Sequence, residues 1–588
     1  MTPAIIIFTT ASAATASRIA TLTGGRVHAC GPAGEGAAEL LPRLFRERVP
    51  IIGVCAAGIL IRLLAPYLGD KHNEPPVIAV SADGKHVVPL LGGHHGANHM
   101  AHDIAIQLGG TAAPTTASDS RFSRGLDEPP PGYVLANPET AKSAMAALLN
   151  GAAIALTGHA PWLEEAGYPL VENGTVAITV SEKRAGDTLT YHPQTLIAGM
   201  GCERGVDAAE AIELLQTVLQ ENGLAPQSLA AIATIDLKSD ETALNAVAAH
   251  FNVPLRLFSA EELAEEADRL PNPSEIVRAE VGTPGVAEAA AIKAGSLLVP
   301  KHKSKKVTCA IGIAPEPIEA AHFGGRRGEL HLVGIGPGEA MQRTTSAVAA
   351  LERTTDWVGY GLYLDLVDDL KTGQVEHRFG LGDEEPRVRH ALELAANGKS
   401  VALICSGDAQ IYAMAALVFE LLQATGTRAV SPAAQRVMVE SHPGISAFQM
   451  ASARAGALIG HDFCCISLSD LLTPRADILK RLDAAALGDF VTAFYNPRSM
   501  RRVDLVEKAK QVFLAHRPPE TPVIIAKSLG RPEEEVRVIR LDALNTEEID
   551  MLTIVLIGSS QSKAFTRGDG NMITFTPRGY QRKAEAAQ

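Results

Sequence analysis

Short apolar runs that alternate with amphipathic segments limit most strongly how this chain can fold. The first three runs are AIIIF (4–8), PIIGVCA (50–56) and PVIAVS (76–81), and residues 36–48 have a helical pattern. Apolar runs without polar alternation are typical of strands that are buried on both faces of a parallel sheet and covered by helices. The pattern predicts an α/β fold rather than a β-sandwich, and an aromatic content of only 4% agrees with this.

The length of 588 residues predicts a multidomain protein, with three or four domains. A proline-rich break, GLDEPPPGY, lies near 125–132, and the clearest linker, PEPIEAAHFGGRRGE, spans 315–329. We expect an N-terminal domain (1–124), a middle segment (125–192), a third domain (193–314), a linker (315–328), a long α/β region (329–562) and a tail (563–588).

Composition excludes several classes of protein. A net charge of −13 argues against non-specific nucleic-acid binding. The seven cysteines are scattered without a C-x-x-C pair, which favours a reduced, cytoplasmic setting. MTPAIIIFTT reads as a first strand rather than a signal peptide, and no run approaches the roughly 18 apolar residues of a membrane span.

The region after the linker contains further strand candidates. Helical patterns at 410–423 and 500–516 alternate with the earlier strands, whereas the later strands follow one another closely, which predicts mixed pairing in the second half. The predicted strands are LHLVGIG (330–336), SVALICSG (400–407), RVMVES (436–441), FVTAFYN (490–496), PVIIAKS (522–528) and MLTIVLIG (551–558).

The stretch HLVGIGPGEA (331–340) places a glycine-rich turn directly after a strand. Gly334 and Gly336 match the first two glycines of a dinucleotide-binding fingerprint, but Glu339 stands at the position of the third. Pro337 also removes a backbone N–H that would bind pyrophosphate. A dinucleotide site is therefore disfavoured, and a glycine turn without a ligand remains an alternative.

Four other strand ends carry similar small-residue turns: CSGDAQIYAMA (405–415), SHPGISAFQMA (441–451), FYNPRS (494–499) and KSLGRPEEEV (527–536). Turns at the carboxyl ends of strands form the ligand-facing edge of an open parallel sheet. Because these turns carry few charges, they indicate a pocket for a folded, largely uncharged cofactor.

These motifs, together with GYGLYLDLV, resemble the tetrapyrrole methylases over 329–562, and specifically the precorrin-3B C(17)-methyltransferases. The resemblance implies a two-domain fold that binds S-adenosylmethionine in the interdomain cleft, usually as a homodimer. For Ile411 and Ala447, packing in the core is an open alternative. The implied cofactor contacts are Pro337, Ser406, Gly407, Asp408, Ile411, Ser446, Ala447, Asn496 and Gly530.

The implied chemistry is an in-line methyl transfer, which mainly requires alignment of the reacting atoms. Related methylases carry an aspartate where this chain has Gly361, so an acid–base role is not expected there. In the C(17) enzymes methylation accompanies contraction of the ring. Tyr360 and Tyr363 are the candidates to steer it, with core packing as an equal alternative.

The densest histidine stretch is GGHHGANHMAHDIA (92–105). Spacings of i, i+4 and i+7 would put His95, His99 and His102 on one helical face. A metal site, a catalytic or ligand-binding turn, and solvated histidines are the three alternatives. We expect no metal, because no cysteine cluster or carboxylate pattern accompanies them.

Residues 1–320 resemble the cobalt-precorrin 5A hydrolases, which open a ring lactone and release acetaldehyde. The matching motifs are GVCAAGILIRLLAP (53–66), LLGGHHGAN (90–98), APTTASD (113–119), GMGCERG (199–205), TIDLKSDETAL (234–244) and VGTPGVAEAAA (281–291). The family's histidine turn reads closer to Ser-Gly-His-x-Gly-Gly-Ala-Asn, and this chain lacks that serine and one glycine.

Lactone opening needs an activated water and a donor for the oxyanion. His94 or His95 is the candidate base, and Glu241 or Glu288 is a candidate to orient the water. Cys202 is a candidate nucleophile, although a buried small hydrophobe is the commoner role. Lys301 and Lys303 would suit the carboxylate arms of a corrin precursor.

We therefore expect two corrin-ring enzymes in one polypeptide. An alternative is a methyltransferase whose N-terminal half binds the tetrapyrrole without catalysis, and a further one is a nicotinamide oxidoreductase that binds NAD at 334–338. In the family's pathway a methylation at carbon 11 lies between the two reactions, so transient contact with that C(11)-methylase is also expected.

Overall fold

The computed structural model describes residues 2–31, 36–70, 73–114, 121–498 and 504–580. The chain divides into two compact units, residues 1–324 and 325–588, and the division falls inside the predicted linker. Each end of the linker is bound to its own unit: the Ile318 N–H donates to the Gln194 carbonyl (3.0 Å), and Arg326 Nε donates to the Gly398 carbonyl (2.6 Å). None of the described helices combines the length and the apolar character that a bilayer span requires.

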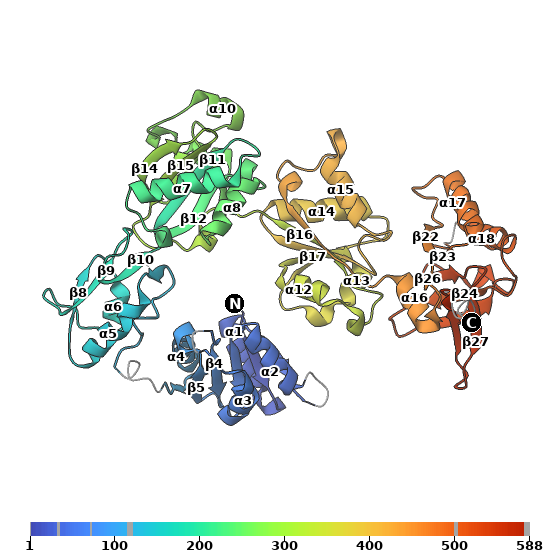
Figure 1. The fold of residues 1–588 in the computed structure, drawn as a ribbon, viewed down its shortest axis with the longest axis horizontal. Coiled ribbons are helices and arrows are strands. Elements are labelled where there is room, and N and C mark those ends of the chain that lie inside the picture. Colours follow the sequence, from blue (N-terminus) through green and yellow to red (C-terminus); the bar gives the residue numbers. More distant parts are fainter. Residues whose placement is uncertain (1, 32–35, 71–72, 115–120, 499–503, 581–588) are drawn as a thin grey trace. The chain divides into compact units, whose positions relative to one another are not determined.

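The first sheet has six strands in the order β2-β1-β3-β4-β5-β6 (dark blue in Figure 1). Its pairs are parallel except β4 with β5, and the predicted apolar runs form the fully buried β1, β3 and β4. Helices α2 and α3 bury one face, and α1 and α4 bury the other. The elements are β1 (Ala4–Ile7), α1 (Ala13–Thr23), β2 (Arg26–Ala29), α2 (Ala37–Arg46), β3 (Ile51–Val54), α3 (Ala57–Leu64), β4 (Val77–Val80), β5 (His86–Leu91), α4 (Ala97–Leu108) and β6 (Thr111–Ala112).

The middle segment forms a sheet of its own with the order β7-β10-β9-β8. Its separate core includes Phe122 and places the ring of Trp162 edge-on to that of Tyr191, with 5.2 Å between the centroids. The elements are β7 (Tyr133–Leu135), α5 (Pro138–Leu149), β8 (Ile154–Thr157), α6 (Pro161–Glu165), β9 (Val176–Val180) and β10 (Leu189–Pro193).

The third sheet has the order β13-β12-β11-β15-β14. Helix α11 lies directly on β11 and β15, where Gly199 and Gly312 leave no room for a Cβ beside the helix backbone. The elements are β11 (Leu196–Cys202), α7 (Ala208–Glu221), β12 (Leu229–Ile235), α8 (Thr242–His250), β13 (Leu255–Phe258), α9 (Ala260–Ala264), α10 (Glu275–Val281), α11 (Ala287–Ile292), β14 (Ser296–Lys303) and β15 (Val307–Ile313).

The second unit begins with a fully parallel sheet in the order β18-β17-β19-β16-β20. Because its strands are parallel, the glycine-rich turns that follow β16, β19 and β20 meet at one edge, which is where open α/β sheets bind ligands. The elements are β16 (Glu329–Gly334), α12 (Thr345–Arg353), β17 (Asp356–Tyr360), α13 (Gly361–Asp365), β18 (Val375–Phe379), α14 (Glu384–Ala396), β19 (Ser400–Cys405), α15 (Ala415–Gln423) and β20 (Met438–His442).

The remaining sheet has the order β22-β23-β26-β24-β25 and confirms the predicted mixed pairing, since only β22 and β23 are parallel. Helices α17 and α18 cover one face and α16 covers the other. The elements are α16 (Ala447–Ala455), β22 (Phe463–Ser467), α17 (Arg475–Leu487), β23 (Val491–Tyr495), α18 (Leu505–Leu514), β24 (Pro522–Lys527), β25 (Glu535–Arg540) and β26 (Thr553–Ile557).

The prediction of a tail over 563–588 is wrong for its first part. Strands β27 (Lys563–Thr566) and β28 (Met572–Phe575) form a hairpin, and β28 pairs with β21 (Gly456–Ala457). Thr574 is fully buried and donates to the Ala455 carbonyl (3.0 Å). The sequence gives little sign of this hairpin, because polar residues rather than an apolar run attach it.

Two predicted helices start later than expected. Helix α15 begins at Ala415 rather than 410, because residues 406–414 form a turn in which Tyr412 has φ 52°. Helix α18 begins at Leu505; the earlier part of its predicted range includes 500–503, which lie outside the described residues.

Candidate functional sites

The turns after β16 and β19 are joined through their backbones. Gly336 and Gly407 form an antiparallel bridge in which each N–H donates to the other residue's carbonyl, at 3.1 Å and 2.7 Å. The turn after β20 joins them through Asp408, whose Oδ2 accepts the Gly444 N–H at 3.1 Å. Three turns that are far apart in sequence therefore form one backbone surface.

Glycine is required where these turns touch. A Cβ on Gly444 would lie 2.5 Å from the Gly334 carbonyl oxygen and closer still to that of Gly407. Gly407 is different, because a Cβ there would meet its first atom only at 3.9 Å, at Ser446 Cα. The turns thus form a tightly packed floor with free space above Gly407, whose φ of 70° itself favours glycine.

Asp408 is half-buried and accepts two backbone hydrogen bonds, one from Gly444 and one from Gln410 to its Oδ1 (2.8 Å). In this structure its carboxylate holds two turns together. The neighbouring Ser406 is also half-buried at the same edge.

The second sheet of this unit supplies a further turn, which begins after β24. A Cβ on Gly530 would lie 2.8 Å from the backbone nitrogen of Glu339 and 3.3 Å from the carbonyl carbon of Pro337. Arg454 on α16 forms ion pairs with Glu339 (3.1 Å) and with Glu534 (2.7 Å). These pairs fix the Pro337 and Gly530 turns against each other.

Ser446 and Ala447 lie beside Gly407, at the start of α16. The Ser446 N–H donates to the side chain of Gln449 (3.0 Å), which helps to begin the helix. Ile411 and Ala447 both pack against the apolar core around Phe448, so the core-packing alternative for them agrees with the structure.

Asn496 is connected to this region through tyrosines. The ring of Tyr412 lies 5.1 Å from that of Tyr495, and its hydroxyl donates to the Cys465 carbonyl (2.8 Å). Asn496 follows Tyr495, has φ 48° and donates to Ser467 Oγ (3.2 Å). The motif FYNPRS ends at residue 499, which lies outside the described residues.

Tyr360 and Tyr363 form an edge-to-face pair with ring centroids 5.3 Å apart, at the end of β17 and on α13. Burial raises the pKa of Tyr363, so its hydroxyl is protonated at neutral pH. Tyr363 is also partly packed against the core of the parallel sheet.

Two arginines near Tyr363 escaped the sequence analysis. The positive charges of Arg531 and Arg387 both act to lower the pKa of Tyr363, against the larger effect of burial. The Nε atoms of both arginines are buried and have no hydrogen-bond partner among the described residues. Arg531 Cγ would lie 3.3 Å from a Cβ on Gly338, so this side chain borders the glycine turn. The one signal in the sequence was the position of Arg531 directly after Gly530.

In the first unit the histidine turn forms a short 3-10 helix, Gly93–His95, between Gly92 and Gly96, which have φ of 72° and 85°. Helix α4 begins only at Ala97, so the prediction that His95 shares a helical face with His99 and His102 is wrong. The reason is Gly96, whose left-handed backbone separates the two helices. The side chain of His94 lies outside the described part of the structure.

His99 contacts the chain directly before the middle segment: its Nε2 lies 3.0 Å from Arg124 Nη2. Burial lowers the pKa of His99, and the charge of Arg124 lowers it further. The described side chains of this histidine segment do not form a metal-ligating group. Of the motif APTTASD, residues 115–119 lie outside the described residues.

A pocket of about 450 Å³ lies at the carboxyl ends of β1, β3 and β4. The histidine turn lies at the opposite edge of this sheet, because β5 is antiparallel to β4 and a Cβ on Gly92 would meet the backbone of Pro75, just before β4. No sequence motif predicted this pocket. Its lining includes the polar side chains Thr9, Ser12, Cys55, Ser81 and His86.

Glu241 is almost fully buried and accepts the Gly205 N–H at 3.2 Å and 3.3 Å. It also pairs with Lys238 and Arg204, both at 3.8 Å. These contacts hold the GCERG turn. Burial raises the pKa of Cys202 in that turn to about 11, which disfavours a thiolate nucleophile at neutral pH.

Glu288 is also buried and accepts three N–H donors: the backbone and side chain of Asn272 (3.2 Å and 2.8 Å) and the backbone of Lys301 (3.0 Å). The Lys301 ammonium donates to the Asn272 carbonyl (2.9 Å), whereas Lys303 is exposed. Glu288 thus braces a loop against β14. Glu241 precedes α8 and Glu288 lies on α11, two helices that pack on the third sheet, whereas the histidine turn follows β5 of the first sheet.

The second unit has the architecture of a two-domain α/β protein with a ligand-binding edge made of glycine turns. A family model described as "Tetrapyrrole (Corrin/Porphyrin) Methylases" matches residues 329–545. In the first unit, models described as "Cobalamin synthesis G N-terminal" and "Cobalamin synthesis G C-terminus" match residues 39–119 and 196–312.

Relatives with curated names match part of this chain. The "Probable cobalt-factor III C(17)-methyltransferase" of Salmonella typhimurium is 41% identical over 251 residues, which are 43% of this chain and 99% of that protein. The "Cobalt-factor III methyltransferase" of Priestia megaterium is 42% identical over 257 residues, 44% of this chain and 46% of that protein, so the chain spans about half the length of that relative. A crystal structure of the methyltransferase CobJ is 36% identical with a TM-score of 0.39, and the match covers 42% of this chain and all of that one. The chain belongs to the tetrapyrrole methylase family.

Proposed function

We propose that this chain is a bifunctional enzyme of corrin-ring assembly. The second unit transfers a methyl group from S-adenosylmethionine to C(17) of precorrin-3B, or of its cobalt form, with contraction of the ring. The first unit opens the lactone of cobalt-precorrin 5A and releases acetaldehyde. The observation that carries the methyltransferase assignment is the Gly336–Gly407 bridge with free space above Gly407.

The residues at this edge suit a bent, cationic nucleoside that carries an amino-acid group. The turns expose small side chains and main chain, and the unpartnered Nε of Arg531 nearby suits a carboxylate arm of the ring substrate. When bound, S-adenosylmethionine supplies an electrophilic methyl group on sulfur. The residues that would hold it are Pro337, Ser406, Gly407, Asp408, Ile411, Ser446, Ala447, Asn496 and Gly530.

The chain's own contribution to methyl transfer is alignment. The joined turns fix the cofactor site, and the Tyr360–Tyr363 pair stands at the end of β17, at the same edge of the parallel sheet. Since the Tyr363 hydroxyl stays protonated, it can donate to a carbonyl or carboxylate of the ring. A positioned pair of reactants needs no strong base for this step.

The methyltransferase assignment is tested with purified protein, the ring substrate and isotopically labelled S-adenosylmethionine. One labelled methyl group should appear in the product by mass spectrometry, with the mass of the ring-contracted form. Asp408→Ala should reduce the rate, because it releases the Gly444 turn. Binding of NAD in calorimetry, with no binding of S-adenosylhomocysteine, would contradict the assignment.

For the hydrolase, His94 or His95 is the proposed base that activates water. Glu241 and Glu288 would act indirectly, because their carboxylates already accept protein N–H groups. The pocket that contains His86 is the competing location within the first sheet.

Aldehyde release distinguishes these locations. The double variant His94→Gln/His95→Gln should abolish it while methyl transfer persists, and His86→Gln is the matched variant at the opposite edge of the sheet. If aldehyde release is lost only in His86→Gln, the hydrolase site is the pocket that contains His86. If the unmodified protein neither opens the lactone nor releases aldehyde, its first unit is a tetrapyrrole-binding module.

We also propose a homodimer formed through the second unit, and transient docking with the C(11)-methylase whose reaction lies between the two activities. Sedimentation tests the dimer. Co-purification, and a coupled assay with and without that methylase, test the docking. The scattered cysteines, which include no C-x-x-C pair, support a reducing, cytoplasmic compartment.

A further inference from the structure

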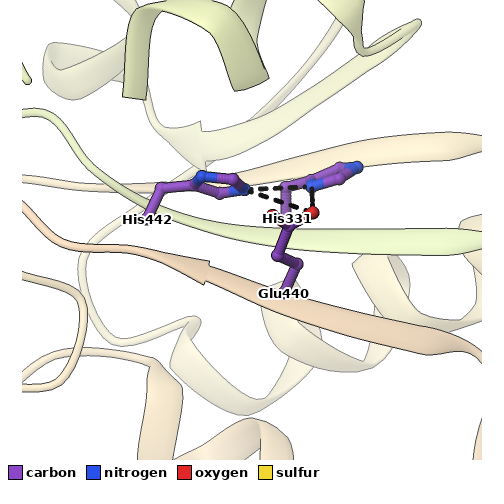
Figure 2. Close-up of side chains that lie close together, drawn as sticks. All are labelled: His331, Glu440 and His442. Carbon is purple, nitrogen blue, oxygen red and sulfur yellow. Dashed lines mark hydrogen bonds and ion pairs between the residues drawn. The ribbon is translucent and has the colours of Figure 1, made fainter. Parts of the chain in front are cut away.

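Three potential metal ligands converge on β16 and β20, beside α12 (Figure 2). His331 and Glu440 are opposite each other in the parallel register of β16 and β20, and His442 lies two residues further on the same face of β20. The two histidines are 1% and 3% exposed, whereas the Glu440 side chain is 47% exposed.

The three ligand atoms have separations close to those in a metal site. His331 Nδ1 lies 3.1 Å from His442 Nε2 and 3.5 Å from Glu440 Oε2, and His442 Nε2 lies 3.8 Å from that oxygen. Tetrahedral zinc with bonds of roughly 2.0–2.2 Å holds its ligands about 3.3–3.6 Å apart. An ion could therefore enter with shifts of a few tenths of an ångström.

The other nitrogen of each histidine is already held. His331 Nε2 lies 3.3 Å from Glu329 Oε2, and His442 Nδ1 lies 2.7 Å from Ser346 Oγ. Metal-bound histidines usually donate their second N–H to such an oxygen, which fixes the tautomer and the ring orientation. With both N–H groups placed in this way, the lone pairs of His331 Nδ1 and His442 Nε2 would face each other, an arrangement that a bound cation stabilises.

Arg353 now supplies positive charge at this position. Its Nη2 lies 2.7 Å from Glu440 Oε2 and 3.3 Å from His331 Nδ1. The Arg353 side chain is half exposed and sits at the last residue of α12, so it can turn into solvent. Arginine and a metal ion would therefore compete for the same carboxylate.

We propose that His331, His442 and Glu440 form a binding site for a divalent transition-metal ion of the zinc class, with water as a fourth ligand. Two imidazoles and one carboxylate suit Zn²⁺ or Co²⁺, and offer too few oxygens for Ca²⁺ or Mg²⁺. The site would link β16 to β20, and it does not depend on the proposed function.

The test is titration of the metal-free full chain with Zn²⁺ by calorimetry, and with Co²⁺ by visible absorption. Glu440→Gln should weaken Zn²⁺ binding at this site at least tenfold and remove the tetrahedral Co²⁺ bands. Arg353→Gln should tighten it severalfold, because it removes the competing cation. His442→Gln should abolish the binding.

A matched control is His390→Gln, because His390 belongs to a second histidine pair in the same unit, with 2.9 Å between His390 Nε2 and His377 Nδ1. This variant should bind Zn²⁺ like the unmodified chain. Circular dichroism checks the fold, and Glu440 is exposed enough for its glutamine variant to fold. Equal Zn²⁺ affinity in the unmodified chain and in Glu440→Gln would overturn the proposal, and so would an unchanged affinity in Arg353→Gln.

Discussion

Gly444 offers a direct test of the joined turns, because a single methyl group there must push them apart. In Gly444→Ala the new Cβ would lie 2.5 Å from the Gly334 carbonyl oxygen, whereas real Cβ atoms essentially never come within 3.0 Å of another atom. The backbone must therefore move by at least about 0.5 Å in a region packed as densely as a crystal. The Gly336–Gly407 hydrogen bond of 3.1 Å would then exceed the usual limit.

The energetic cost follows from these distances. Overpacking costs about 1–3 kcal/mol, and each weakened backbone hydrogen bond about 1 kcal/mol. We expect the second unit to lose roughly 2–4 kcal/mol, divided between folding and the geometry of the cofactor site. If only 1.4 kcal/mol of this acts on the site, the affinity for S-adenosylhomocysteine falls about tenfold.

The assay is calorimetric titration with S-adenosylhomocysteine, together with thermal unfolding of the second unit. Gly568→Ala is the control, because its Cβ would meet nothing within 4 Å and its backbone is not left-handed. It should bind like the unmodified protein. An unchanged affinity in Gly444→Ala would refute the view that these turns position the cofactor.

Three further predictions concern single side chains. Arg531→Gln should raise KM for the ring substrate about tenfold, because it removes one charge-assisted hydrogen bond, while the affinity for S-adenosylhomocysteine stays within about twofold. If the affinity for S-adenosylhomocysteine falls as much as KM rises, Arg531 binds the cofactor. Burial raises the pKa of Asp356, but hydrogen bonds from Lys399 and two other side chains outweigh it and hold this pKa below the usual 3.8. Its contribution is therefore fully present above that pH and is lost as the pH falls through the lower folded value. Asp356→Asn should lower the stability to urea at pH 7, and this loss should shrink as the pH is lowered below 3.8. Cys202→Ala should keep the rate of aldehyde release within about threefold, because a thiol with a pKa of about 11 is almost wholly protonated; a hundredfold loss would make it the nucleophile.

Much of the fold could be predicted from local patterns. The apolar runs of β1, β3 and β4 are buried on both faces, and such runs have few alternatives to a parallel sheet. The hairpin of β27 and β28 could not be predicted in this way, because its attachment depends on the buried hydroxyl of Thr574. Likewise the histidine segment has helical spacing, but Gly96 interrupts the helix.

The sequence by itself determined the α/β class, the linker and the glycine turns at strand ends, because each depends on residues that are near neighbours in the chain. Only the tertiary structure decided which turns meet, which buried carboxylates already have partners, and where His331 lies relative to Glu440 and His442. The physical reason is strand register: parallel pairing brings together residues that are more than a hundred positions apart, and their spacing along the chain carries no sign of it.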